Sequence, residues 1–262
     1  MVYWAVFVKN VRLQMMYRAE FIFTILGSLL SIYVQIAIWQ ALLAQSPELS
    51  PIPINAMITY VIIFYVIRQA SHTNFFSVMA QKVNRGDIAV DLIRPVNLKN
   101  MLLSEQASEN VCTIIFSIAP VAVLASVFWG FELLASPAAL AIFIPTAILA
   151  IILTFYITYI FSLLIFWTRE QVYPRQICGG LLLIFSGSAV PLWFYPQWLQ
   201  TLGMFLPFRL MGFESIQIFM GLLDIQQAVM VLAHQILWLG GLWLLERFIW
   251  SRIKNNVFVQ GG

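Results

Sequence analysis

Charged and metal-binding side chains are scarce in this chain of 262 residues. Only 10% of the residues are charged while 61% are hydrophobic, which excludes an ordinary soluble domain. Cys112 and Cys178 form no Cys-x-x-Cys pair, and His72 and His234 lie far apart in the sequence. The pattern therefore predicts neither a disulfide framework nor a zinc site. The net charge of +3 is modest, and nucleic acid is not an expected partner.

Signatures of catalysis are missing as well. The sequence has no Gly-x4-Gly-Lys-Ser/Thr run, which would provide a phosphate-cradling loop. It also has no Ser/His/Asp arrangement or carboxylate pair in a segment expected to be open to water. The chain is therefore predicted not to be an enzyme and to bind no cofactor itself.

Long apolar stretches make up most of the sequence. Six of them have about the length of ~20 residues that crosses a ~30 Å hydrocarbon core. Backbone polar groups in lipid must be satisfied within the segment, so each crossing is expected to be a helix. The sequence predicts an all-α membrane protein with six transmembrane helices and a single domain, residues 1–262. The spans are expected at residues 20–43, 54–78, 105–129, 137–167, 177–195 and 226–245.

The basic residues predict the orientation of these spans. If the first span runs from inside to outside, 13 of the 14 Lys and Arg residues fall on the inner side. Only Arg209 then falls on the outer side. The positive-inside rule favours this arrangement. It places both termini in the cytoplasm and the protein in the plasma (inner) membrane.

The N-terminal segment, residues 1–19, predicts an amphipathic helix in the headgroup plane. Lys9, Arg12 and Arg18 bring charge to this short segment. Its apolar residues at helical spacing are Trp4, Phe7, Val8, Val11 and Met15. One interpretation is an elbow helix that sets the inner boundary of the first span and packs against a neighbouring subunit. The other is a simple interfacial anchor, and periodicity alone does not separate the two.

The cytoplasmic loop at residues 79–104 contains a predicted short helix. Gly86 is expected to end the preceding helix, Asp87 to cap the new one and Pro95 to end it. Spacings of three and four residues give this helix a charged face and an apolar face. The charged face holds Asp87, Asp91 and Arg94, and the apolar face holds Ile88, Leu92 and Ile93. Such a helix fits a docking element for a partner, or a helix that lies against the membrane and caps itself.

Residues 191–225 are too apolar for an aqueous loop. Pro191, Pro196 and Pro207 break the segment, so it is not expected to form another span. Short re-entrant helices dipping into the outer leaflet are predicted instead. They fit an outer gate over a path through the membrane, or an aromatic belt without a gating role. Arg209 and Glu214, its nearest acid, are candidates for an ion pair within one chain or between subunits.

Small residues thin out the fifth predicted span. Gly179, Gly180 and Gly187 allow close approach of another helix, or mark points where the span flexes along the path. In the third span, Glu105 and Glu109 share a helical face near the inner interface, where hydration is expected. No charged pair is apparent inside the spans.

Taken in order, these segments resemble the membrane subunit of a type-2 ABC exporter, in the branch of drug-resistance and daunorubicin-type permeases. The resemblance covers essentially the whole chain. Its two motifs are Arg-Gly-Asp-Ile-Ala-Val-Asp-Leu-Ile-Arg-Pro at residues 85–95 and Leu-Pro-Phe-Arg at residues 206–209. Related permeases often continue with a Tyr-x-Pro-like segment, where this chain has Gly212-Phe213-Glu214. This departure bears on the type of substrate.

The resemblance implies a division of labour between subunits. Residues 79–104 would form a coupling loop on separate cytoplasmic ABC ATPase subunits, which would bind ATP and Mg. The second and fifth spans would line a path, and residues 191–225 would form its outer gate. Two permeases would pair in the lipid bilayer, as a homodimer or with a related partner, and move a hydrophobic or amphipathic substrate outward. The implied coupling residues are Gly86, Asp87, Ile88, Asp91, Leu92, Arg94 and Pro95. The implied outer-gate residues are Pro191, Pro196, Leu206, Pro207, Phe208, Arg209 and Glu214.

Two other function classes are open at this point. A secondary transporter or channel independent of ATP is the alternative reading. Such proteins tend to place coupling charges or broken helices near the midplane, often in inverted repeats, and no clear repeat is visible. A membrane-embedded enzyme would need clusters of His or acidic residues at a shared depth, and the sequence shows none.

Overall fold

The structure is a computed structural model that describes residues 2–16, 18–45, 50–88, 97–132 and 135–259. Every regular element in these ranges is helical, which confirms the predicted all-α class. The elements are α1 (Val2–Gln14), α2 (Arg18–Gln45), α3 (Ile54–Ala70), α4 (Phe75–Arg85), α6 (Leu98–Thr113), η2 (Ile114–Ile118), α7 (Ala119–Trp129), α8 (Pro137–Leu163), α9 (Ile165–Thr168), α10 (Val172–Phe185), η3 (Leu192–Phe194), α11 (Gln197–Met204), η4 (Pro207–Met211), α12 (Phe213–Phe219) and α13 (Ile225–Val259).

Five helical segments in the described part of the chain are long and apolar enough to cross a membrane. They correspond to five of the six predicted spans and make the chain a multi-pass membrane protein. These segments are Phe21–Gln45, Ile54–Arg85, Leu98–Trp129, Pro137–Thr168 and Ile225–Ile253.

The predicted fifth span, residues 177–195, is not one continuous helix. α10 is the only α-helix in this range; its 14 residues rise about 21 Å, which is short of a ~30 Å hydrocarbon core. Gly187 follows with a φ of 78°, a left-handed conformation that ends helices, and Pro191 lies just beyond. The chain then forms the short elements η3, α11, η4 and α12. The prediction of short helices between residues 191 and 225 is therefore correct as secondary structure.

The second and third spans also differ in detail from the prediction. The second span is interrupted between Ala70 and Phe75, where the polar run Ser71–Asn74 is not helical. The third span begins earlier than predicted, because the Asn97 side chain caps α6 by accepting from the N–H of Asn100 (3.4 Å). This span contains the π-helical turn η2, directly before α7 with its proline in the first turn. Proline has no N–H to donate to the preceding turn, which favours such a bulge.

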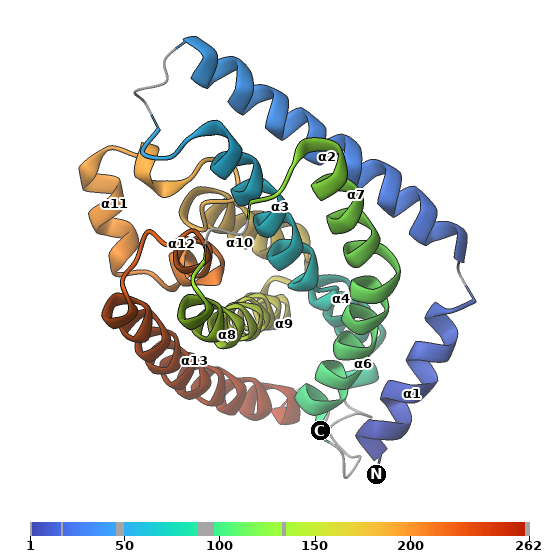
Figure 1. The fold of residues 1–262 in the computed structure, drawn as a ribbon. Coiled ribbons are helices and arrows are strands. Elements are labelled where there is room, and N and C mark those ends of the chain that lie inside the picture. Colours follow the sequence, from blue (N-terminus) through green and yellow to red (C-terminus); the bar gives the residue numbers. More distant parts are fainter. Residues whose placement is uncertain (1, 17, 46–49, 89–96, 133–134, 260–262) are drawn as a thin grey trace.

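The central helix of the bundle is α8, which lies between α13 on one side and α3 on the other (Figure 1). α2 packs on the outer side of α3 and α7, and η4 and α12 pack against α8. α1 lies along α6, where the N–H of Asn97 donates to the Tyr3 hydroxyl (3.1 Å). The predicted N-terminal helix is therefore present, and its position in the headgroup plane stays a prediction.

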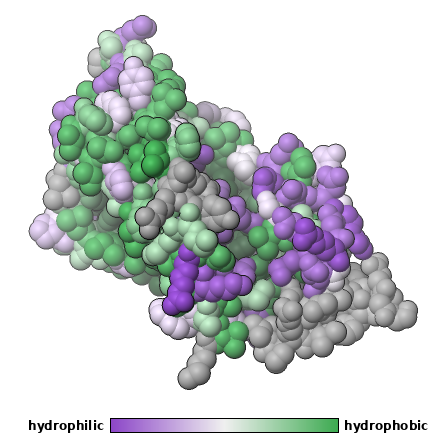
Figure 2. Space-filling view, turned by 90° about the vertical axis from the view of Figure 1, so that its right-hand side faces the viewer, coloured by the Kyte–Doolittle hydropathy of each residue, from purple (hydrophilic) through white to green (hydrophobic). Residues whose placement is uncertain are grey.

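Polar and apolar side chains are segregated along the bundle. We call the end where α4 ends, α6 and α10 begin and α13 ends the basic end. It holds Arg85, Lys99, Arg175 and Arg247, among other basic residues. At the opposite end, the Asn55 amide donates to Glu132 (3.1 Å). In a side view, polar side chains gather in one part of the molecule while apolar side chains cover much of the rest (Figure 2).

Candidate functional site

A cavity of about 510 Å³ lies between the second span, α8 and α10. Its wall on one side is the broken second span, from Phe64 in α3 through the interruption to Phe76 in α4. Thr154 and Thr158 of α8 and Leu182 of α10 line the other sides. The second and fifth predicted spans thus enclose a common space.

Two arginines line this cavity. In Arg175, Nη2 donates to the Ser77 hydroxyl (2.8 Å), and the guanidinium lies over the Phe76 ring with 5.8 Å to its centroid. Arg68, in the last turn of α3, is exposed. Neither arginine has an ion-pair partner among the residues that the structure describes. Sequence reasoning counted both residues only as cytoplasmic charge.

The other part of the cavity wall is apolar and poor in free donors. The Thr154 hydroxyl donates to the carbonyl of Ala150 (2.9 Å), and the Thr158 hydroxyl donates to the carbonyl of Thr154 (2.7 Å). Both hydroxyls therefore donate their protons inside α8. Phe64 and Leu182 add apolar surface. A ligand here would meet guanidinium groups on one part of its surface and hydrocarbon on another.

An aromatic cluster borders the cavity on the side away from α4. It consists of Tyr60, Phe64, Trp193 and Phe213. The Tyr60 ring lies 5.9 Å from Phe64 and 5.3 Å from Trp193, and Trp193 lies 5.2 Å from Phe213, measured between centroids. The Tyr60 hydroxyl donates to the carbonyl of Gly187 (2.9 Å), which ties the cluster to the end of α10. The cluster closes this side with packed rings.

The segment between α10 and α13 reaches deep into the bundle. The Gln235 amide donates to the carbonyls of Leu210 in η4 (2.9 Å) and Thr146 in α8 (3.0 Å). Thr146 and Gln235 lie nine and ten residues from the starts of their helices, so η4 sits about 14 Å inside the opposite end of the bundle. α12 then leads back, since Phe219 contacts Phe143 near the start of α8 (5.2 Å). The chain therefore runs toward the middle of the bundle and back, and its position in a membrane leaflet stays a prediction.

Arg209 and Glu214 form an ion pair within this segment of one chain, which is one of the two arrangements that the sequence suggested. The exposed fractions of the two side chains are 19% and 8%. The pair lies on η4 and α12 and therefore well inside the bundle, whereas the sequence placed Arg209 simply on the outer side. Pairing offsets the high cost of an isolated charge at this depth.

The other predicted gate residues shape the same segment. Pro191 and Pro196 precede the first residues of η3 and α11, and Leu206 precedes η4, which begins with Pro207. Phe208 is buried and stacks on Phe185 at the end of α10 (6.3 Å between centroids). The prolines therefore divide the segment into short helices, and their role in gating stays a prediction.

The interruption of the second span is satisfied by α6, which sequence reasoning missed. The Gln106 amide donates to the carbonyl of His72 (3.0 Å) and its oxygen accepts from the N–H of Asn74 (3.0 Å). The Asn110 amide donates to the carbonyl of Ala70 (2.9 Å). Irregular backbone at membrane depth needs such partners. The signal in the sequence was the polar run Ser-His-Thr-Asn inside an apolar stretch.

The predicted coupling helix lies only partly within the described residues. α4 ends at Arg85 and Gly86 adopts a left-handed φ of 77°, which confirms that Gly86 breaks the helix. Asp87 and Ile88 are helical, and Ile88 is 4% exposed, so its side chain anchors this loop in the core of the chain. Asp91, Leu92, Arg94 and Pro95 lie outside the described residues.

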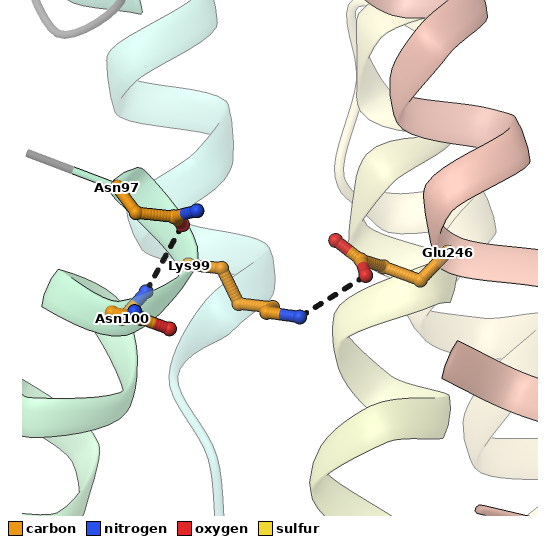
Figure 3. A network of polar contacts seen from close by, with 4 residues as sticks. All are labelled: Asn97, Lys99, Asn100 and Glu246. Carbon is orange, nitrogen blue, oxygen red and sulfur yellow. Dashed lines mark hydrogen bonds and ion pairs between the residues drawn. The ribbon is translucent and has the colours of Figure 1, made fainter. Parts of the chain in front are cut away.

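Within residues 79–104, the start of α6 is joined to α13 by an ion pair. The Lys99 ammonium lies 3.1 Å from Glu246 Oε2, and the exposed fractions of the two side chains are 16% and 6% (Figure 3). Lys99 also lies over the Tyr156 ring of α8, 5.5 Å from its centroid. Lys99 lies two residues after the cap residue Asn97. The start of α6 is therefore fixed to both α8 and α13.

The three glycines singled out in the fifth span differ in their surroundings. Gly179 and Gly180 lie inside α10, and a Cβ at either position would have no neighbour within 4 Å. Gly179 also lines the cavity. Only Gly187 has a positive φ, and a Cβ there would lie 2.9 Å from the Tyr60 hydroxyl. The helix breaks at Gly187, while Gly179 and Gly180 leave its surface open.

Comparison with protein families identifies this architecture. The model of the ABC-2 family transporter protein matches residues 7–255 of the chain. The chain belongs to the ABC-2 transporter family. Searches of curated proteins and of solved structures found no match. ABC-2 proteins are the membrane components of ABC transporters; they are not themselves catalytic and generally pair with ATPase subunits.

Membership of the ABC-2 family gives the cavity and the loop a common context. An ABC-2 permease needs a space that a substrate can enter and a surface that responds to the ATPase.

Among the described residues, no group of three His, Cys, Asp or Glu side chains could hold a metal ion.

Proposed function

We propose that this ABC-2 protein is the permease of an ATP-driven exporter that moves a hydrophobic or amphipathic substrate outward. The observation that carries the proposal is the cavity between the second span and α10. It is lined by basic residues and bordered by an aromatic cluster packed against the re-entrant segment. This arrangement fits a permease that receives substrate from the cytoplasmic side and is closed toward the outside.

In this proposal, α10 and the re-entrant segment together complete a sixth crossing. Both termini and the basic end lie in the cytoplasm, and the protein resides in the plasma (inner) membrane. A cysteine introduced at Ser46 should then react with an impermeant thiol reagent in intact cells, whereas one at Asn255 should react only after the membrane is opened. Labelling of Asn255 in intact cells contradicts the orientation.

The driving force comes from cytoplasmic ABC ATPase subunits docked at residues 79–104. ATP and Mg bind to these subunits, and ATP binding tilts two paired permeases, either identical or closely related. Arg209 and Glu214 hold the outer gate together in the resting state. Membership of the drug-resistance and daunorubicin-type branch belongs to the same proposal.

Purification of the solubilised chain tests this proposal directly. An ABC ATPase should purify with it, and the complex in liposomes should couple ATP hydrolysis to transport. Replacing Asp91 and Arg94 together by alanine should uncouple hydrolysis from transport. Replacing the exposed Glu170 and Arg252, an acid and a base outside the loop, should leave the coupling unchanged.

Two outcomes would decide against it. Transport that needs no ATP and follows an ion gradient would establish the secondary transporter instead. Full coupling in the Asp91→Ala/Arg94→Ala complex would show that residues 79–104 do not dock the ATPase.

A further inference from the structure

The cavity between the second span and α10 carries charge of one sign only. Arg68 and Arg175 line it, and none of the lining residues that the structure describes is acidic. The acid closest to this region in the hydrogen-bond network is Glu109, which lines a neighbouring polar pocket. Its carboxylate accepts from the side-chain amides of Asn74 (3.1 Å) and Gln106 (3.3 Å) on that other side. Among the described residues, no ion pair joins it to Arg68 or Arg175.

The cavity extends from these charges into apolar surroundings. Arg175 lies in the first turn of α10, while Ser186, one residue beyond its end, also lines the cavity. Eleven residues of helix rise about 16 Å, which is roughly half of a ~30 Å hydrocarbon core. Leu182 and Met211 line the cavity along this length. An occupant therefore meets a cationic region near the basic end and apolar walls beyond it.

We propose, on the basis of the proposed function, that the substrates are amphiphiles with an acidic headgroup. The carboxylate or phosphate would bind between Arg68 and Arg175 while the hydrocarbon part lies beside Leu182 and Met211. Guanidinium groups match these anions in shape and charge. Arg175 is held for this role by Ser77 and the Phe76 ring. A cationic amphiphile of the same size would meet repulsion from both arginines.

Binding to the full chain in a neutral detergent tests this ligand class. The probe is dansyl-undecanoic acid, and the matched ligands are its methyl ester and the corresponding amine, which keep the chain and change only the charge. The acid should bind at least about 10-fold more tightly than the ester, because hydrogen bonds to charged groups contribute more than neutral ones. The amine should bind more weakly than the ester.

Two substitutions locate the effect. Arg68→Gln and Arg175→Gln should each weaken binding of the acid about 10-fold and leave the ester within about twofold. Arg247→Gln is the matched control, since Arg247 also lies over an aromatic ring, Trp243 (4.5 Å), and does not line the cavity. It should bind all three ligands like the unaltered chain. Equal binding of acid, ester and amine, or equal loss of all three in the arginine variants, overturns the proposal.

Competition identifies the source of the headgroup. Displacement of the probe by phosphatidylglycerol, but not by single-chain acids, supports a membrane lipid, and the reverse supports an acylated acid from the cytosol. If neither displaces it, the site does not recognise acidic amphiphiles. No ATPase is present in this binding assay, so a loss of charge selectivity refutes only the proposed ligand class. The exporter proposal is tested separately, by co-purification of an ATPase and by the ATP dependence of transport.

Discussion

Replacing Lys99 by methionine should destabilise the protein by removing the only partner that the structure shows for the Glu246 carboxylate. Glu246 is 6% exposed, and its carboxylate would be left without a partner among α6, α8 and α13. Removing one partner of a buried pair costs about 3–5 kcal/mol. Since the Lys99 side chain is 16% exposed, we expect a loss of about 2–4 kcal/mol.

The reciprocal change is expected to cost less. Glu246→Gln leaves an ammonium that still lies over the Tyr156 ring, 5.5 Å from its centroid, and can reach toward water. We expect a loss of about 1–2 kcal/mol for this variant. The double variant should be more stable than the sum of the two losses predicts, because neither charge is then left alone.

Unfolding of the purified chain in detergent measures these effects. A chain of this size loses about 2–4 °C in midpoint temperature for each kcal/mol, so Lys99→Met should lower the midpoint by roughly 4–16 °C. Lys9→Met is the matched control, because Lys9 is exposed on α1; its midpoint should change by no more than about 2 °C. The reasoning is refuted if Lys99→Met and Lys9→Met unfold at the same midpoint temperature. It is also refuted if the losses in the Lys99→Met/Glu246→Gln double variant are strictly additive.

Three further predictions concern the interruptions of the second and fifth predicted spans and the segment between α10 and α13. Gly187→Ala should lower the unfolding midpoint, because a side chain at a φ of 78° adds about 1–2 kcal/mol of backbone strain and its Cβ would lie 2.9 Å from the Tyr60 hydroxyl. Gly180→Ala is the control: a Cβ there has no neighbour within 4 Å, so this variant should be neutral or stabilising. Gln106→Leu should cost about 1–3 kcal/mol and increase hydrogen exchange at residues 71–74, and unchanged exchange there would contradict its role. Arg209→Ala should reduce transport more than assembly because Glu214 loses its partner, and equal losses in both assays would make the pair purely structural.

The predicted spans and the basic asymmetry came from local features of the sequence. Apolar residues over about 20 positions can satisfy their backbone only in helices, so α2, α7, α8 and α13 were foreseeable. Gly86 was also recognisable, since a glycine after Lys82 and Arg85 ends helices through a left-handed φ. The pair of Arg209 with Glu214 was suggested because Glu214, five residues on, is the acid nearest in sequence to the only basic residue expected on that side.

Other features depended on residues distant in sequence. Periodicity does not show that Gln106 and Asn110 satisfy the backbone near Asn74, so the second span read as one helix. α10 looked long enough to cross because the apolar run continues past Gly187, and the contact of Gly187 with Tyr60 is not visible in the sequence.

The sequence by itself determined that this is an all-helical membrane protein with its charge gathered at one end, because hydropathy and charge act through neighbouring residues. Only the tertiary structure decided which polar groups meet. Lys99 and Glu246 lie 147 positions apart, and Arg68 and Arg175 come from different spans, yet each pair shares one site. Contacts between such distant residues depend on how the helices pack. The surfaces that determine this packing come together only in the assembled bundle.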